Sequence, residues 1–580
     1  MIKRLLQCLR EYRKPTILTP IFMVGEVTCE CIIPLLTAQL INGIQAGRGM
    51  DFITKYGLGL LAIAMLSLGF GALAGVFCAS ASAGFAKNLR HDLFTQVQKF
   101  SFANIDRFST SSLVTRLTTD VTNVQMAFMM IIRTAVRSPL MLIFAVAMSI
   151  RVGRKLAWIF VGIIPILGLG LSFMIYKALP LFKAVFKKYD NMNASIQENV
   201  QGMRVVKSFV REDYEIRKFA ATSDDVRKDF TRAEGILAFN NPLMQLCVSS
   251  SLILISFFAS MLIVQSGGAY LNVGSLTGMI TYSMQILMSL MMLSMIFVMI
   301  TMAVESARRI CEVLNEEPTL HNPENAIREV ADGSIIFDHV SFKYSQQAET
   351  MSLSDINLNI ASGMTVGIIG GTGSGKTTLI QLISRLYDVT EGCIKVGGQD
   401  IRDYDLEVLR NQVAVVLQKN TLFSGTIREN LHWGNPDASD EELERICKLA
   451  QADEFIQRFP DKYDTYIEQG GANVSGGQKQ RLCIARALLK KPKILILDDS
   501  TSAVDTKTDA LIRGAFRSEI PGTTKIIIAQ RISSVENADL ILVMDNGRIA
   551  AMGTHETLLQ TSSIYQEVYY SQNKAGVDNG

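Results

Sequence analysis

Residues 370–378 read GGTGSGKTT and follow the apolar, strand-like run Met364–Ile369. This is the P-loop pattern, which is expected between a strand and a helix. Its glycines let backbone N–H groups surround phosphate oxygens, and the helix N-terminus adds a favourable dipole. We expect Lys376 to reach the β- and γ-phosphates of a nucleotide and the Thr377 hydroxyl to hold Mg²⁺. The predicted phosphate-binding residues are Gly370, Thr372, Gly373, Ser374, Gly375, Lys376, Thr377 and Thr378.

Two stretches downstream narrow the class of ATPase. Residues 473–481 read NVSGGQKQR, and the apolar run Ile494–Leu497 ends in Asp498, twelve residues after Arg486. The second stretch has the form of a Walker B strand, whose aspartate positions Mg²⁺. The first resembles the signature motif of ABC transporters. With the P-loop, these stretches make the chain similar to an ABC transporter subunit, and the resemblance covers nearly all of it.

The resemblance implies roles for further residues. Tyr344 lies thirty-two residues before Lys376 and matches the aromatic side chain that stacks on adenine. Gln418, at the end of VVLQ, matches the Q-loop glutamine that contacts Mg²⁺ and the attacking water. Residues 468–471 match the X-loop of exporters, and residues 502–505, which end in Asp505, match the D-loop. Each residue alone would pass for an ordinary surface residue, so their order and spacing carry the assignment.

The signature motif is intact, and the family implies a partner for it. ABC ATPase domains dimerise head to tail, so each nucleotide lies between one P-loop and the opposite signature. We therefore expect the signature residues to close over the P-loop of a second chain. These residues are Ser475, Gly476, Gly477 and Gln478.

Two positions depart from a competent hydrolytic site. Asp499 stands where the family has the glutamate that acts as general base, and Gln530 stands where it has the switch histidine. Aspartate is one methylene shorter, and a misplacement of about 1 Å can cost on the order of a hundredfold in rate. Glutamine can hydrogen-bond but cannot take up a positive charge. Together they predict a site that binds ATP and hydrolyses it slowly.

This combination resembles one subunit of a heterodimeric bacterial exporter. Its partner would supply the catalytic glutamate and histidine, while this chain supplies the good signature. A homodimer with two slow sites is the alternative. A regulatory ATP-binding subunit is a second alternative, of a different functional class.

The first three hundred residues contain six apolar segments long enough to cross a bilayer, which takes about 20 residues each. The 580-residue chain has a net charge of only +3, which argues against nucleic acid as a partner. A soluble DNA-repair ATPase would share the signature but would lack these segments. The segments are Thr16–Ile44, Gly57–Phe85, Phe128–Ile150, Leu156–Leu179, Leu237–Gln265 and Val273–Val304.

Long polar stretches separate segments two and three, and segments four and five. These stretches, Ala86–Met126 and Pro180–Gly235, are rich in Lys and Arg, as is the N-terminus. The basic excess predicts that they lie inside the cell, with both termini cytoplasmic, in a multi-pass protein of the cytoplasmic membrane. We expect two helical hairpins that end in transverse turns near Ser101–Ser112 and Asn199–Val210. Residues 202–209 also resemble an intracellular-loop motif of type IV exporters.

Two intramembrane features are candidates for substrate binding. Glu26 and Glu30 lie one turn apart in segment one, where carboxylates are costly and usually face a cavity or a partner. They could attract a cationic substrate, lie near the interface, or pair with Arg133 or Arg137. A methionine face on segment six could accept varied apolar ligands or form an ordinary helix seam. Its members include Met284, Met288, Met291, Met295 and Met299.

We expect a six-helix transmembrane domain over residues 1–315, a linker over 316–333, an α/β P-loop ATPase domain with a helical subdomain over 334–572, and a flexible tail over 573–580. The expected ligands are ATP and Mg²⁺. The predicted activity is ATP-driven export of hydrophobic or amphipathic compounds. Lipid, peptide or siderophore transport, siderophore import included, cannot be separated from drug export by these residues. The nine cysteines show no zinc-site spacing and predict reduced thiols.

Overall fold

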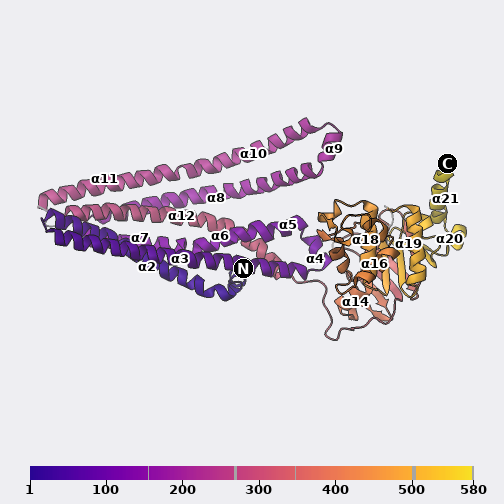
Figure 1. Ribbon diagram of the computed structural model, residues 1–580. Helices are drawn as coiled ribbons and strands as arrows, with labels where there is room; N and C mark the ends of the chain where they lie inside the picture. The colour runs from indigo at the N-terminus through magenta and orange to yellow at the C-terminus, as the bar shows by residue number, and fades with distance from the viewer. Residues whose placement is uncertain (154–155, 267–270, 346–347, 500–503, 578–580) are drawn as a thin grey trace. The chain divides into compact units, whose positions relative to one another are not determined.

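The computed structural model describes residues 1–153, 156–266, 271–345, 348–499 and 504–577 (Figure 1). The chain forms two compact units. The helical unit comprises residues 1–99 and 109–316, and the sheet unit comprises residues 100–108 and 317–580. The short segment 100–108 therefore belongs with the C-terminal residues, although it lies far from them in sequence.

Among its described residues, the helical unit contains six helical stretches that are long and apolar enough to cross a membrane, which confirms the number of predicted segments. Two stretches combine several helices, because a π-helical turn (Arg116–Asp120) joins α5 to α6, α7 follows α6 after one residue, and α10 leads into α11. The helices are α1 (Ile2–Gln7), α2 (Arg13–Gln45), α3 (Met50–Gln98), α5 (Thr110–Thr115), α6 (Val121–Ile132), α7 (Thr134–Gly153), α8 (Trp158–Gln201), α9 (Met203–Ser208), α10 (Glu212–Ala238), α11 (Asn240–Ser266) and α12 (Val273–Asn315).

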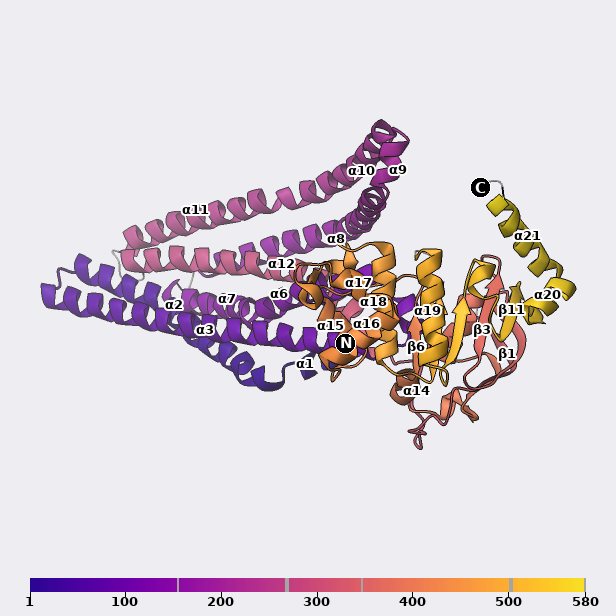
Figure 2. The ribbon, with the colours of Figure 1, turned by 45° about the vertical axis from the view of Figure 1, so that its right-hand side comes forward.

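The helices extend well beyond bilayer thickness. Helix α3 has 49 residues, which at 1.5 Å per residue gives a length of about 70 Å. Helices α8 and α10 form a long hairpin with α9 across its tip (Figures 1 and 2). The hairpin is held by Lys188, which lies 2.7 Å from Asp229, and by an edge-to-face contact of Phe182 with Phe230. Helix α9, at the tip, lies within Asn199–Val210, where the sequence predicts a transverse turn.

Helix α12 approaches α2 closely at Gly274. The Gly274 N–H donates to Asn42 Oδ1 at 2.9 Å, and a Cβ atom at position 274 would lie only 2.0 Å from the Ala38 carbonyl oxygen. Small residues allow such close backbone approach where apolar helices pack. One turn along α12, a Cβ atom at Gly278 would meet nothing nearer than 3.6 Å.

The sheet unit is built on a six-stranded sheet in the order β12-β11-β3-β10-β9-β6. All neighbours are parallel except β11 and β12. Every residue of β9 and β10 is buried, as expected for central parallel strands covered on both faces. The strands are β3 (Thr365–Gly370), β6 (Val413–Val416), β9 (Ile494–Asp498), β10 (Thr524–Ile528), β11 (Leu540–Asp545) and β12 (Arg548–Gly553).

A second, antiparallel sheet has the order β2-β1-β4-β5, and a two-stranded pair joins β7 to β8. The strands are β1 (Ile335–Phe342), β2 (Leu353–Ile360), β4 (Glu391–Val396), β5 (Gln399–Asp400), β7 (Gly425–Thr426) and β8 (Tyr466–Ile467). The helices are α4 (Phe102–Arg107), α13 (Lys376–Ile383), α14 (Leu406–Gln412), α15 (Ile427–His432), α16 (Asp440–Leu449), α17 (Asp453–Ile456), α18 (Gly476–Leu489), α19 (Thr506–Glu519), α20 (His555–Thr561) and α21 (Ser563–Val577). Helices α15 and α16 pack on α18 as a helical layer, which matches the expected α/β fold with a helical subdomain.

Gly274→Ala should lower the stability of the helical unit by about 1–3 kcal/mol, because the added methyl group forces α2 and α12 apart. The measurement is the midpoint of thermal unfolding of the purified chain in detergent. Gly278→Ala is the matched control and should leave the midpoint nearly unchanged, since its methyl group has room. Equal midpoints for the two variants would contradict the close approach at Gly274.

Candidate nucleotide site

The P-loop lies between β3 and α13, as the sequence predicts. Its last glycine, Gly375, precedes α13 with a φ of +95°, in the left-handed region that glycine favours. A Cβ atom there would also lie 2.8 Å from the Leu353 side chain and 3.0 Å from the Ser352 carbonyl oxygen. Glycine at this position is therefore required both by backbone conformation and by space.

Lys376 is held within the loop. Its ammonium group donates to the carbonyl oxygens of Gly370 and Gly371 at 2.9 and 2.7 Å. Burial lowers the pKa of Lys376, and the nearby Asp498 and Asp499 oppose this by favouring the charged form. These contacts hold the Lys376 ammonium group at the loop that the sequence predicts to bind phosphate.

Thr377 and Asp498 form a set of oxygen atoms suited to Mg²⁺. The Thr377 hydroxyl lies 3.2 and 3.4 Å from the two carboxylate oxygens of Asp498. Asp498 is buried, and this burial raises its pKa, while the hydrogen bond from Thr377 acts in the opposite direction. Hydroxyl and carboxylate oxygens are ligands that Mg²⁺ accepts, so these residues fit that ion. When bound, Mg²⁺ neutralises charge on the β- and γ-phosphate oxygens.

The three residues predicted for the hydrolytic step lie together. Gln530 donates from Nε2 to Asp499 Oδ2 at 2.7 Å, and Gln418 Nε2 lies 3.5 Å from the same oxygen. Asp499 is buried and has a φ of +47°, and its N–H donates to the Ile528 carbonyl oxygen. Two side-chain amides therefore approach one carboxylate oxygen immediately beyond the Walker B strand.

Tyr344 borders a cavity of about 590 Å³ that the P-loop also lines. Its hydroxyl lies 3.0 Å from both Thr378 Oγ1 and Gln381 Oε1, and the residue is 47% exposed. An exposed ring at the edge of this cavity fits the predicted stacking on adenine. Sequence reasoning missed the other walls, Thr350–Ser352 and Asn546–Gly547. The Asn-Gly pair signals only a turn, so nothing in it pointed to a nucleotide.

Tyr387 connects Tyr344 to helix α4. The Tyr387 hydroxyl donates to Asp106 Oδ2 at 2.6 Å, and its ring lies edge-on to Tyr344 at 5.2 Å and near Phe102 at 6.1 Å. Burial and the neighbouring Asp106 raise the pKa of Tyr387, which therefore stays a hydrogen-bond donor. Asn104 adds a second tie, from Nδ2 to the Glu317 carbonyl oxygen at 3.0 Å. Two ring contacts, Tyr344 with Tyr387 and Tyr387 with Phe102, thus connect the edge of the nucleotide cavity to α4.

The signature residues begin α18, away from this cavity. Ser475 caps the helix by accepting from the Gln478 N–H, and the Ser475 N–H donates to Gln478 Oε1 at 2.9 Å. Among the described residues that line the P-loop cavity, no signature residue occurs. This is the arrangement expected if Ser475, Gly476, Gly477 and Gln478 act on another chain's nucleotide.

The D-loop prediction lies partly outside the described residues, since Ser502 and Ala503 are among those not described. Asp505 is described and caps α19 by accepting from the Thr508 N–H at 2.9 Å. This contact, from the backbone of Thr508, lowers the pKa of Asp505. Its local role is therefore that of a helix cap.

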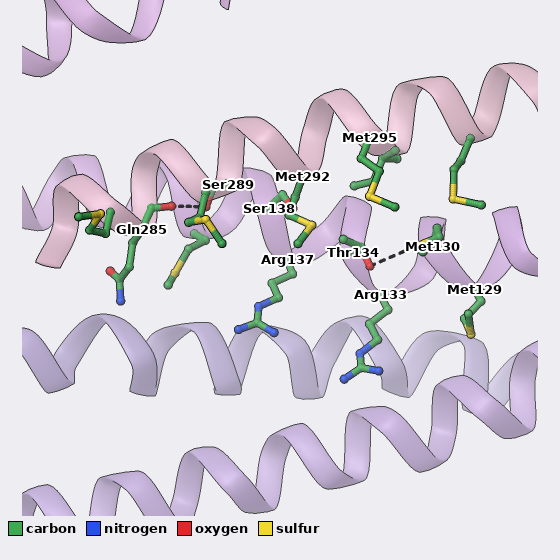
Figure 3. A pocket seen from close by; sticks show the side chains of 15 residues that line it. Met129, Met130, Arg133, Thr134, Arg137, Ser138, Gln285, Ser289, Met292 and Met295 are labelled. Carbon is green, nitrogen blue, oxygen red and sulfur yellow. Dashed lines mark hydrogen bonds between the residues drawn. The ribbon is translucent and has the colours of Figure 1, made fainter. Parts of the chain in front are cut away.

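A second cavity, of about 600 Å³, lies in the helical unit between α6, α7 and α12 (Figure 3). Four of the predicted methionines line it: Met284, Met288, Met295 and Met299. The fifth, Met291, instead packs against a cluster with Ile163 and Leu167, and Met292 takes its place in the cavity wall. Sequence reasoning missed Met129, Met130 and Met141, because they lie on other helices and share no periodicity with α12.

The carboxylates of α2 have a partner. Arg137 lies 3.3 Å from Glu26 and 2.7 Å from Glu30, so the pairing alternative is the one the structure shows. Glu26 is 7% exposed, and a Cβ atom at Gly71 of α3 would lie 3.2 Å from its carboxyl carbon. Glu26 is therefore enclosed by α2, α3 and α7 and does not line the cavity.

Together, the six apolar helical stretches and the P-loop site define a membrane-embedded ATPase. A model of the ABC transporter transmembrane region matches residues 16–290, and a model of the ABC transporter domain matches residues 353–502. The chain is 36% identical to an uncharacterized ABC transporter ATP-binding protein of Bacillus subtilis, YfiB, over 98% of both chains. It is 34% identical to an uncharacterized ABC transporter ATP-binding protein of Mycobacterium tuberculosis over the full length of both. The chain belongs to the ABC transporter family, and its second unit is an ABC ATPase domain.

A solved structure supports the fold. One similar solved structure is that of a bacterial Atm1-family ABC exporter with ATP bound. The two structures superimpose with a TM-score of 0.84, and the superposition covers 97% of this chain and 99% of the other. Sequence identity in that comparison is 24%, so the likeness concerns the fold.

Tyr387→Phe should loosen α4 from the sheet unit, because it removes the hydrogen bond to Asp106 and keeps the ring. Loss of one such bond costs about 1 kcal/mol, so we expect amide hydrogen exchange in residues 100–108 to speed up about fivefold. Mass spectrometry of the deuterated full-length chain measures this. Tyr570→Phe, at an exposed tyrosine of α21, is the control and should change nothing in α4. Unchanged exchange in Tyr387→Phe would mean that the hydroxyl does not anchor α4.

Proposed function

We propose that this chain is one half of an ATP-driven exporter of amphipathic compounds and that it works with a different ABC chain in the cytoplasmic membrane, with both termini cytoplasmic. The observation that carries the pairing is the Asp499–Gln530 contact of 2.7 Å. A short carboxylate and an amide occupy the positions that the family uses for a general base and a switch histidine. The chain would bind ATP and Mg²⁺ and hydrolyse slowly at its own P-loop.

The geometry gives a reason for slow hydrolysis. Asp499 is drawn toward Gln530, and its carboxylate is shorter by one methylene than the glutamate it replaces. An amide can donate a hydrogen bond but cannot take up a proton from the reaction or gain positive charge beside the γ-phosphate. The phosphate-binding parts are complete: Lys376 lies in the loop, and Thr377 lies beside Asp498. In this proposal the site therefore keeps the residues that bind ATP but lacks those needed for fast hydrolysis.

The proposed cycle assigns hydrolysis to the other composite site. That site would combine the partner's P-loop and catalytic residues with this chain's signature at the start of α18. ATP binding would bring the two ATPase domains together, and helices α4 and α9 would pass the motion to the membrane helices. Hydrolysis at the competent site would then reset the transporter.

Tagging this chain in its native membranes and purifying it gently tests the partnership. Mass spectrometry should find a second ABC chain in equal amount, with glutamate after its Walker B aspartate and histidine at its switch position. Recovery of this chain paired only with itself would contradict the heterodimer. A partner that transports cargo without contact to this chain's cavity would favour a regulatory role.

Restoring the catalytic residues should restore hydrolysis. In the complex whose partner lacks its catalytic glutamate, the double substitution Asp499→Glu with Gln530→His should raise ATP turnover at least about tenfold, because the carboxylate regains its reach. The readout is phosphate release. Asp461→Glu, at an exposed turn position, makes the same chemical change elsewhere and should have no effect. No gain in the double variant, with ATP binding intact, would refute the proposed cause of slow hydrolysis.

A further inference from the structure

The helical-unit cavity has a distinctive chemical lining. Eight methionines and Ile296 supply its apolar surface, and Thr134, Ser138, Gln285 and Ser289 supply neutral polar groups. Its charged lining residues are Arg133 and Arg137, and among the described lining residues there is no carboxylate. Figure 3 shows the two guanidinium groups extending in the same direction from neighbouring turns of one helical stretch, with Met292 and Met295 on the facing helix α12.

The two arginines differ in how their charge is balanced. Arg137 is bound to both Glu26 and Glu30, which hold its guanidinium from the side of α2. Arg133 lies one turn earlier, at the junction of α6 and α7, and forms no salt bridge with any residue in the described part of the chain. Arg133 is therefore the guanidinium that remains open to an incoming ligand.

A cation within an apolar helical bundle is expensive unless it meets an anion. Arginine is also the side chain best suited to a planar acid group, because its fork can donate two parallel hydrogen bonds. Beside it, flexible thioethers can follow the shape of an apolar or aromatic body. Of the alternatives open for Glu26 and Glu30, the structure shows the pairing with Arg137, so neither carboxylate is offered here as the group that binds the ligand.

We propose that this cavity binds amphipathic organic anions, with the acid group on Arg133 and the apolar body against the methionines of α6, α7 and α12. The inference rests on the proposed export function and names the chemical class of its cargo. Arg137 is not assigned the acid group, since its charge is already shared between two carboxylates.

The test compares two pyrene probes of opposite charge, 1-pyrenebutyrate and 1-pyrenemethylamine. Binding is measured by fluorescence to the intact complex in nanodiscs of zwitterionic lipid, without nucleotide, after subtraction of empty nanodiscs. Wild type should bind the butyrate at least about tenfold more tightly than the amine. Arg133→Gln should weaken butyrate binding about tenfold or more and leave the amine unchanged, since it removes a charge-assisted hydrogen bond in an apolar site. Arg133→Lys should fall between the two.

Three further variants control for the loss of an arginine elsewhere and for a change in the cavity wall. Arg151→Gln changes an arginine of α7 that does not line the cavity and should leave both probes unaffected. Thr134→Asp places a carboxylate beside Arg133 and should also weaken the butyrate, whereas the neutral Thr134→Asn should not. Tighter binding of the amine to wild type, or full butyrate affinity in both Arg133→Gln and Thr134→Asp, would overturn the proposal.

Transport in proteoliposomes separates this proposal from the proposed function. ATP-dependent movement of the butyrate that Arg133→Gln abolishes supports both. Saturable butyrate binding without any ATP-dependent movement supports the anion site and contradicts export. ATP-dependent movement of the amine alone would uphold export and overturn the anion site.

Discussion

The register of three parallel strands positions the P-loop and the Walker B carboxylate of the ATPase domain. Ile528 of β10 pairs with Ile368 of β3 on one side and with Asp498 of β9 on the other. The ends of β3 and β9 therefore reach the same edge of the sheet, where the P-loop and the Walker B carboxylate meet. Asp499 then turns out of the strand with a positive φ, while its N–H remains bonded to Ile528. A slip of one residue in this pairing would separate Thr377 from Asp498.

The sequence predicted what local patterns encode. The P-loop, the Walker B strand and the signature motif each depend on residues close together in the chain, and six apolar stretches are visible by length alone. What escaped prediction depends on contacts between distant segments. Residues 291 and 292 differ by about 100° around a helix, so deciding which faces a cavity requires knowing where α6 and α7 lie. Tyr387 gave no signal, because its meaning comes from Asp106, 281 residues earlier.

The membrane helices illustrate how pairing decides the charge of a cavity. From sequence, the two carboxylates on one turn of α2 could attract a cationic ligand, lie near the interface or pair with Arg133 or Arg137. Once Arg137 reaches both, the carboxylates become part of the helix packing, and Gly71 lets α3 close over Glu26. The number of charged residues in a helix therefore does not predict the charge of its ligand. The charge that a cavity presents to a ligand depends on which charged groups are already paired with each other.

The same reasoning applies to the Asp499–Gln530 pair. A carboxylate that holds a water for attack must be free to turn toward that water, and its neighbour must tolerate the charge that develops on the γ-phosphate. Here the shorter carboxylate is directed at an amide that has two protons to donate and no basic nitrogen. In the proposed heterodimer, the intact signature would serve the nucleotide of the partner chain, because in a head-to-tail dimer each chain contributes one half to each site. In that arrangement the two halves of one chain would be selected separately, the P-loop for binding ATP and the signature for the partner's hydrolysis.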